Sequence, residues 1–450
     1  MTANPATAES RAIAHLQELV CIPTVSQLDD ADTDWAQFSR FIETLPALYP
    51  LVHEHLGREL VGEFSMLYRW RGRTTDGPSV LMAHYDVVPA TAEGWKHPPF
   101  SGELANDDLG RPVIWGRGTL DDKGSLVVTL EAVEALLADG FTPEHDVYLS
   151  FGHNEETAGD GAQGIVNLLE ARGIVPAFVL DEGGAVVEGI FPGVDDPIAV
   201  IGVAEKGILT LTMTVDQNGG HASTPPRLTA TARLAKAIVA LNRKPFRAGF
   251  TATNLEMIRT LGAHARQPLR FAFTKLWLTR GLLLWLFRRL GDETSAIVRT
   301  TQAVTQLSGS QAANALAERA VATVNIRVAV GSSVADAVEH VRRAVADPAV
   351  RLETHQPSEP SAVSPTTGPA WDLLRNTVEA TYPGTIVTPY VMLGASDSRH
   401  FTRISGNVYR FSPFEMSKDE RGTLHAMNER ITVSTFLRGI EFYRRLIAGL

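Results

Sequence analysis

A short apolar run that ends in two spaced polar residues constrains this chain more than any other feature. Residues 80–83 (Val-Leu-Met-Ala) have the composition of a buried strand, and His84 and Asp86 follow them. Side chains two positions apart on an extended segment point to the same side, so His84 and Asp86 can act together at the edge of a sheet. Alone, such a pair is more often structural than a metal site, so the rest of the chain has to supply further ligands.

Strands and helices alternate on both sides of this run. The patterns predict strands over residues 64–69, 79–83, 113–115, 147–152 and 177–180, and helices over residues 9–20, 35–48, 123–137 and 164–171. This alternation is typical of an α/β domain with a largely parallel sheet, which places its chemistry in the loops beyond the strand ends.

The pattern changes after Glu205, and a chain of 450 residues is too long for one ordinary core. Further along, the patterns predict strands over residues 207–215, 320–330 and 350–355 and helices over residues 229–241 and 334–345, which indicates a smaller inserted α+β domain. The expected division is an α/β catalytic domain from residues 1–205 and 358–450, and a lid or dimerisation domain from residues 206–357 with a helical insertion at about 243–300.

Charge and cysteine content narrow the class of protein. The formal net charge is −10, and no block of Lys or Arg is long enough to indicate nucleic-acid binding. The one cysteine, Cys21, has no partner for an internal disulfide, which suits either a reducing compartment or a fold that needs no disulfide. Residues 1–9 contain neither the basic nor the apolar part of a signal peptide, so we expect a cytoplasmic protein.

One stretch, residues 271–290, invites comparison with a membrane segment, but basic residues interrupt it at Lys275, Arg280, Arg288 and Arg289. It lacks the ~20 apolar residues of a span, so we expect an amphipathic or buried helix and no membrane span. We favour a helical addition that packs on the lid or at a subunit contact. The alternative is an apolar wall for a long acyl group, which would favour N-acyl amino acids over small dipeptides.

Four further polar clusters follow predicted strand ends or turns. They are residues 116–124 with Asp121, residues 153–156 with Glu155 and Glu156, residues 180–184 with Asp181 and Glu182, and residues 424–430 with His425. Histidine and carboxylate ligands without thiolates suit two divalent ions such as zinc, with cobalt or manganese as alternatives. Neighbouring carboxylates point in different directions, so one of Glu155 and Glu156 can bind metal while the other takes a proton from the attacking water.

Six motifs occur in one order along the chain: M-A-H-Y-D-V-V-P, G-R-G-T-L-D-D-K-G, N-E-E-T-A-G, V-L-D-E-G-G, G-G-H-A-S and T-L-H-A-M-N-E-R-I. Together they resemble the M20 family of co-catalytic metallopeptidases, particularly its carboxypeptidase S and N-acyl-amino-acid hydrolase branch. The resemblance implies a zinc-peptidase-like catalytic domain that holds two zinc ions. The ligands that it implies are His84, Asp121, Glu156, Asp181 and His425, with Asp121 bridging the ions.

The resemblance also implies roles for residues around the metals. Asp86 would orient His84, and Glu155 would be the general base. The fourth acidic ligand has two candidates, because Asp181 and Glu182 are adjacent and either matches the family position. We prefer Asp181, since it directly ends the apolar run.

Residues of the inserted domain and of the C-terminal part resemble the family's substrate site. His221 would stabilise the oxyanion of the tetrahedral intermediate, often in the active site of a partner subunit, so we expect a homodimer through the inserted domain. Asn314 and Arg327 would bind substrate, the arginine by gripping a free carboxylate. Backbone amides around Gly394 would hold the same carboxylate.

We therefore predict a di-zinc carboxypeptidase or dipeptidase that cleaves an amide bond in a small substrate with a free carboxylate. An aminoacylase acting on N-acyl amino acids is the alternative. A non-catalytic metal- or peptide-binding protein is a remote alternative. The presence of Glu155 argues against it, because a protein that only binds does not need a general base. The chain lacks a nucleophile motif such as G-x-S-x-G, which disfavours a serine or cysteine hydrolase.

Overall fold

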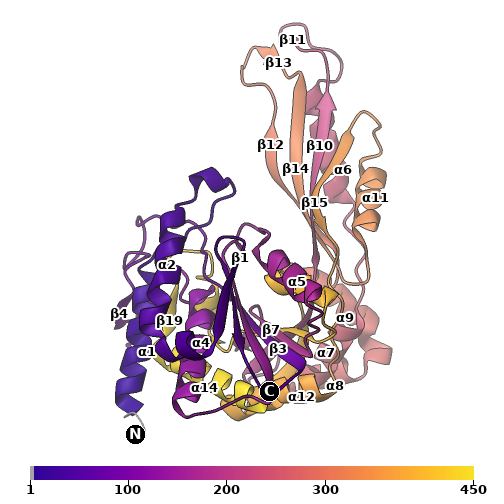
Figure 1. Cartoon of the computed structure of the whole chain (residues 1–450). Helices are drawn as coiled ribbons and strands as arrows, with labels where there is room; N and C mark the ends of the chain where they lie inside the picture. The colour runs from indigo at the N-terminus through magenta and orange to yellow at the C-terminus, as the bar shows by residue number, and fades with distance from the viewer. Residues whose placement is uncertain (1–4) are drawn as a thin grey trace.

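A ten-stranded mixed sheet organises the larger of two domains in the computed structural model, which describes residues 5–450 (Figure 1). Along the sheet the strands follow the order β1 (Gly57–Val61), β2 (Ser65–Trp70), β6 (His145–Gly152), β3 (Thr74–His84), β7 (Phe178–Asp181), β17 (Val408–Arg410), β9 (Ile198–Glu205), β8 (Ala185–Val187) and β18 (Glu415–Met416), and β16 (Ile386–Met392) also pairs with β9. Strands β6, β3, β7 and β17 run parallel, whereas β1, β2 and β8 form antiparallel pairs. The predicted α/β class is confirmed, and the parallel arrangement holds for the centre of the sheet.

Helices cover both faces of this sheet. One core contains residues of α1 (Pro5–Val20), α2 (Trp35–Leu48), α3 (Pro50–His55), α4 (Lys123–Ala138), α12 (Pro369–Thr381) and α14 (Val433–Gly449). The opposite core contains residues of α5 (Gly161–Ala171) and the 3-10 helix η2 (Asp397–Arg403). Strand β3 is buried on both sides, with Leu81 and Ala83 in the first core and Val80 and Met82 in the second. Burial on both faces explains why its sequence is an unbroken apolar run.

A separate three-stranded sheet joins the C-terminal part of the chain to the N-terminal part. β5 (Pro112–Trp115) pairs with β4 (Glu103–Asn106) on one side and with β19 (Arg430–Thr432) on the other. The short helices η1 (Asp30–Asp32) and α13 (Lys418–Arg421) complete this domain. Because Asp121 closely follows β5 and His425 closely precedes β19, the pairing of β5 with β19 brings these two residues together.

The inserted domain is a four-stranded antiparallel sheet with two helices on one face. Its strands follow the order β12 (Thr301–Ser308), β14 (Arg319–Val328), β10 (Gly207–Asp216) and β15 (Arg351–Ser358), and α6 (Ala230–Arg243) and α11 (Val334–Val345) share their core. A small ladder of β11 (Gly220–His221) and β13 (Ala315–Leu316) lies at the end farthest from the larger domain (Figure 1). The alternation predicted for residues 207–215 is present, since Leu209, Leu211 and Met213 are fully buried.

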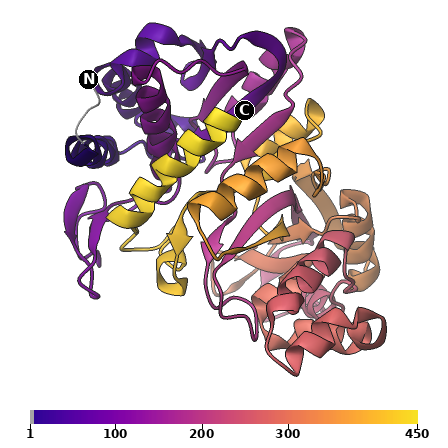
Figure 2. The same ribbon diagram turned by 90° about the horizontal axis from the view of Figure 1, so that it is seen from below.

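The helical insertion comprises α7 (Ala252–His264), α8 (Leu269–Thr274), α9 (Leu276–Leu290) and α10 (Asp292–Ile297). These helices form a projecting lobe beside the larger domain (Figure 2). Their apolar core includes Phe191, Ile198 and Ile386 from the larger domain. The sequence predicts that the insertion packs on the lid or at a subunit contact. Packing on the lid is wrong, because its apolar side chains meet strands β9 and β16 of the large sheet, and the subunit contact stays a prediction.

The sequence predicts no membrane span and no signal peptide. Among the described residues, no helix is long and apolar enough to cross a membrane. Residues 1–4, which open the stretch that argues against a signal peptide, lie outside the described residues.

Candidate metal centre

The polar clusters meet at the carboxyl ends of the central parallel strands. β3 ends at His84, whose ladder neighbour is Gly152 at the end of β6, and Glu155 and Glu156 lie in the turn that follows. β7 ends at Asp181, directly before Glu182. Because parallel strands carry their carboxyl ends to one edge of the sheet, residues distant in the sequence become neighbours there.

Asp121 lies between two histidines. Its Oδ1 is 3.0 Å from His84 Nε2, and its Oδ2 is 3.0 Å from His425 Nε2. Burial acts to raise the pKa of Asp121, but the hydrogen bonds from His425 and His84 outweigh it and hold the pKa well below its usual range. The carboxylate therefore stays ionised and offers one oxygen to each side, which is the geometry of a bridging ligand.

Each histidine has a further carboxylate beside it. His425 Nε2 lies 3.1 Å from Glu156 Oε2, and His84 Nε2 lies 3.8 Å from Glu182 Oε1. His84, Asp121, Glu156, Glu182 and His425 are called the strand-end cluster below. The cluster consists of two half-sites, each with one histidine and one glutamate, that share Asp121.

The cluster fits divalent metal ions. Ligand atoms of His84, Asp121 and Glu156 lie within 4.8 Å of one another, as do those of His84, Asp122 and Glu182. Glu156 Oε1 is buried and has no hydrogen-bond partner within residues 5–450. A buried carboxylate oxygen without a partner is costly unless a cation satisfies it. Imidazole and carboxylate donors without thiolate suit zinc, cobalt or manganese.

Asp86 holds both His84 and the turn that carries the glutamate pair. Its carboxylate accepts hydrogen bonds from Ser26 Oγ at 2.7 Å and from the backbone N–H groups of Glu155 and Glu156 at 3.2 and 3.1 Å. His84 Nδ1 lies 3.3 Å from Asp86 Oδ1 and 3.0 Å from its carbonyl oxygen. One buried carboxylate thus orients the His84 ring and fixes the position of Glu155 and Glu156.

Glu155 shares with Glu182 and Asp397 a raised pKa, one of the conditions for a general base. Burial raises its pKa well above the ordinary value, and the charges of Asp397, Glu156 and Asp86 act in the same direction, against the opposing charge of His84. A raised pKa allows a carboxylate to accept a proton from water and release it later in a reaction.

Asp181 and Glu182 point to different surroundings. Asp181 is 2% exposed, and its Oδ2 accepts a hydrogen bond from Ser398 N at 2.8 Å, behind the cluster. Glu182 instead reaches towards His84. The geometry therefore favours Glu182 over the predicted Asp181 as the acid beside His84.

Glu429 is an important residue that the sequence reasoning did not identify. It is fully buried, and its Oε1 accepts hydrogen bonds from the backbone N–H groups of Gly118, Leu120 and Asp121 at 3.0, 2.9 and 3.2 Å. Its Oε2 accepts one from Arg117 Nη1 at 2.5 Å. Glu429 thus shapes the turn that presents Asp121. Its place four residues after His425, in the same motif, is the signal that was available.

The predicted substrate residues are divided between the two ends of the inserted domain. Arg327 lies near the end of β14 close to the larger domain, where burial and then the charge of Arg399 lower its pKa. His221 lies on β11 and Asn314 directly precedes β13, the two strands of the ladder at the far end (Figure 1). Both residues are exposed, and Asn314 O accepts a hydrogen bond from Ala222 N at 3.0 Å. Within one chain, the structure does not bring His221 or Asn314 to the strand-end cluster.

Gly394 lies in the loop after β16, near the larger domain's Glu205. In that loop Ser396 N donates to Glu205 Oε2 at 2.7 Å, and Glu205 also pairs with the buried Arg410 at 3.3 Å. The loop is therefore anchored to a buried ion pair next to the site.

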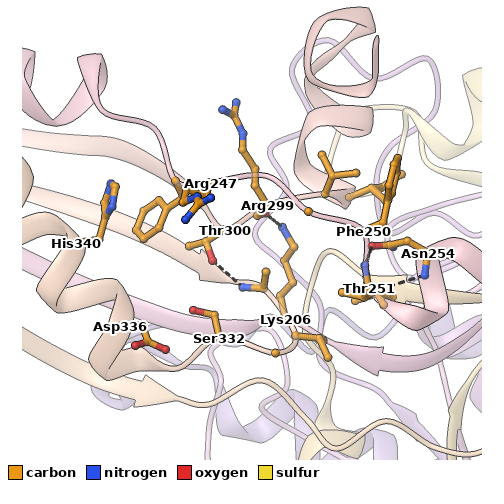
Figure 3. Close-up of a pocket in the computed structure, with 18 of the residues that line it drawn as sticks. Lys206, Arg247, Phe250, Thr251, Asn254, Arg299, Thr300, Ser332, Asp336 and His340 are labelled. Atoms are coloured by element: carbon orange, nitrogen blue, oxygen red, sulfur yellow. Dashed lines mark hydrogen bonds between the residues drawn. The ribbon is translucent and has the colours of Figure 1, made fainter. Parts of the chain in front are cut away.

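A cavity of about 390 Å³ lies where the inserted domain, the helical insertion and the large sheet meet (Figure 3). Lys206, Arg247 and Arg299 give it a basic lining, and Lys206 Nζ donates to the carbonyl oxygens of Ala296 and Arg299 at 2.6 and 2.8 Å. Burial, followed by the charge of Arg299, lowers the pKa of Lys206 to about 8. No residue of the strand-end cluster lines this cavity.

The fold and the cluster define the class of the protein. An α/β sheet that gathers two histidines and carboxylates around one shared aspartate, with an inserted sheet domain, is the arrangement of a metal-dependent hydrolase.

The chain belongs to Peptidase family M20/M25/M40, whose sequence model matches residues 80–449. It is 36% identical over 427 residues to "Probable carboxypeptidase S-like 2" of Dictyostelium discoideum, with 93% of this chain and 80% of that protein covered. It is 35% identical over 441 residues to "N-fatty-acyl-amino acid synthase/hydrolase PM20D1" of Homo sapiens, with 96% and 86% covered.

Solved structures show the same fold at low sequence identity. An M20 family metallo-carboxypeptidase from Sulfolobus solfataricus, Sso-CP2, superposes with a TM-score of 0.72 at 17% identity, covering 97% of this chain and 98% of that one. The family membership and the site together make the chain a metal-dependent peptide or amide hydrolase.

Proposed function

We propose that this enzyme uses two divalent ions, with zinc the expected metal, to cleave an amide bond in a small substrate that carries a free carboxylate. The observation that carries the proposal is Asp121, which directs one oxygen to His84 and the other to His425. The proposed ligands are His84, Asp121 and Glu182 for one ion, and His425, Asp121 and Glu156 for the other. Glu182 replaces Asp181 in this assignment because Asp181 already accepts a hydrogen bond from Ser398 N.

The bound ions would polarise the amide carbonyl and make water acidic enough to attack at neutral pH. Glu155 takes the proton of the attacking water and then gives it to the leaving nitrogen. Asp86 keeps Glu155 in place through the backbone of the turn. Arg327 and the loop around Gly394 bind the substrate carboxylate, which sets the position of the amide bond relative to Glu155.

His221 and Asn314 complete the site from a second copy of the chain in this proposal. Both are exposed at the end of the inserted domain farthest from the strand-end cluster, so another copy has to supply them if they act. His221 would then donate to the oxyanion of the tetrahedral intermediate. A homodimer is the assembly that this requires.

For the substrate, we propose a peptide first, so that the enzyme acts as a carboxypeptidase or dipeptidase. N-acyl amino acids are the second candidate, favoured by the 35% identity to a protein named as an N-fatty-acyl-amino acid synthase/hydrolase. Both substrates present an amide followed by a free carboxylate, so one site serves either. We also propose a cytoplasmic location, because the single cysteine has no partner for an internal disulfide.

The decisive test is Glu155→Gln in zinc-loaded enzyme. The change keeps the shape of the side chain but removes the base, so activity should fall about 10²–10⁴-fold while metal content stays the same. Full zinc-dependent activity in this variant would contradict the proposal.

Assays of dipeptides and of long-chain N-acyl amino acids, before and after chelation, would choose between the two substrate classes. Asp181→Asn and Glu182→Gln, compared by metal content, would test the choice of ligand.

A further inference from the structure

Helix α9 has apolar side chains on both of its faces. Leu276, Leu283 and Phe287 are buried and anchor the helix in the core of the insertion. The other face is open to solvent, with Trp277 84% exposed and Leu282 63% exposed. Of the fifteen large apolar side chains most exposed in the described part of the chain, six lie within residues 271–290: Phe271, Trp277, Leu278, Leu282, Trp285 and Leu290. A surface helix normally turns polar residues to water, so this outer face indicates a docking surface.

The outer face is also strongly basic. Residues 270–290 contain five basic residues and no acidic one, in a chain whose net charge is −10. All five are exposed, and none forms an ion pair with another residue of the described chain: Arg270, Lys275, Arg280, Arg288 and Arg289. The first acidic residues beyond this stretch, Asp292 and Glu293, begin the next helix. The Arg289 guanidinium lies over the Trp285 ring at 5.0 Å, which places a cation at an exposed aromatic side chain.

The combination of exposed apolar and basic side chains distinguishes between three possible partners of this face: a second copy of the chain, an acyl group and a membrane surface. A second copy bound through a two-fold interface would set the same basic residues against one another, and like charges across an interface are repulsive. An acyl group inside the active site would need an enclosed wall, whereas Trp277 and Leu282 are open to solvent. A membrane surface offers both anionic headgroups for the basic residues and an apolar boundary for Trp and Leu side chains.

We propose that the outer face of α8 and α9 (Phe271, Trp277, Leu278, Leu282, Trp285, Leu290 and the five basic residues) docks the enzyme on bilayers that contain anionic lipids. The helix lies in the interface and does not cross the bilayer, which agrees with the absence of a spanning helix among the described residues. The proposal does not depend on the substrate class or on the metal assignment. Docking would keep the enzyme at the membrane surface, where amphiphilic molecules partition.

Vesicle flotation of the full chain tests the proposal. The protein should float with phosphatidylcholine vesicles that contain about one third phosphatidylglycerol and should stay behind with pure phosphatidylcholine, because headgroup charge supplies part of the attraction. Raising the salt concentration should release it. The double variant Trp277→Glu and Leu282→Glu should bind at least about tenfold more weakly, since it removes apolar contacts and adds repulsive charge. Arg280→Gln with Arg288→Gln should weaken binding and reduce its salt dependence.

A matched control places the same charge on a distant exposed leucine. Leu109 is 77% exposed, so Leu109→Glu should leave vesicle binding unchanged. Because the substituted residues are exposed, every variant should keep its activity on a water-soluble substrate, which shows that it is folded. Failure of the wild type to float with anionic vesicles, or equal binding to both vesicle types, would overturn the proposal. So would a dimer, measured by light scattering, that Trp277→Glu dissociates, because the face would then bind a second copy.

Discussion

Two histidines that the sequence marks as functional lie in opposite surroundings. His84 is 2% exposed, and both of its ring nitrogens lie close to acidic residues, Asp86 on one side and Asp121 on the other. His221 is exposed on a two-residue strand, and its Nδ1 has a hydrogen bond with the neighbouring Ser223 Oγ at 2.7 Å. The larger domain therefore gathers its candidate ligands within one chain, whereas His221, at the far end of the inserted domain, lies away from them.

The largest effect should come from Asp121→Asn. A carboxamide is a poor bridge between two cations, so we expect loss of bound metal and a fall in activity of at least about 10³-fold. Metal analysis of the purified protein and a peptide-hydrolysis assay would measure both. Asp108→Asn, at an aspartate with an 85% exposed side chain, is the matched control and should change neither. Normal metal content in Asp121→Asn would show that Asp121 is not needed to bind metal. The larger domain would then not differ from the inserted domain in the way described above.

Asp86→Ala should have the next largest effect. The change frees the His84 ring and leaves the Glu155 and Glu156 backbone N–H groups without their acceptor. Loss of such an orienting group typically costs about 10–100-fold in metal affinity or activity. Ser26→Ala, which removes one of the hydrogen bonds to Asp86, should show a weaker form of the same defect. Metal titrations of the two variants would rank them, and an equal defect in both would contradict this account.

His221→Ala should leave metal binding intact and lower kcat by about 10²-fold, the usual cost of one oxyanion donor. Coexpression with the Asp121→Asn chain sharpens the test. If two copies complete each other's sites, mixed dimers contain one intact site, and the preparation should recover about one quarter of wild-type activity. Wild-type kcat in His221→Ala would show that the far end of the inserted domain has no part in the reaction. An affected kcat without recovery on coexpression would show that His221 acts in its own chain.

The smallest effect concerns His400 on η2, in the larger domain. Burial, and then the charges of Arg399 and Arg403, lower its pKa to about 4. In the unfolded chain its pKa is about 6.5, so between these values the unfolded state binds more protons than the folded state. Stability should therefore fall as the pH drops from about 6.5 to about 4, and His400→Gln should flatten that part of the curve. Urea unfolding at several pH values would measure the difference, and an unchanged slope would exclude His400 as its source.

The sequence was sufficient to predict the parts of the site that depend on local patterns. The apolar run before His84 predicts its strand, and the acids that follow the other strands lie where a parallel sheet would bring them. Ser26 and Glu429 were missed because their partners, Asp86 and the Asp121 turn, are distant in the sequence.

Two other points depended on three-dimensional contacts. The strand period does not decide between Asp181 and Glu182, because β7 ends at Asp181 and the backbone then turns. An apolar helix such as α9 can pack on any apolar neighbour, so its sequence did not show that the insertion meets β9 and β16 instead of the lid.

The position of Glu429 has a consequence for the synthesis of the protein. His425 and Glu429 lie in one short segment near the end of the chain, yet one is proposed to bind metal and the other holds the turn of Asp121. A ribosome-bound chain that has not yet released this segment lacks the histidine of one half-site and the glutamate that holds the turn of Asp121, the residue shared by both. The newly made enzyme should therefore be unable to cleave a substrate until this segment has been translated, and a premature stop upstream of the segment should yield an inactive product.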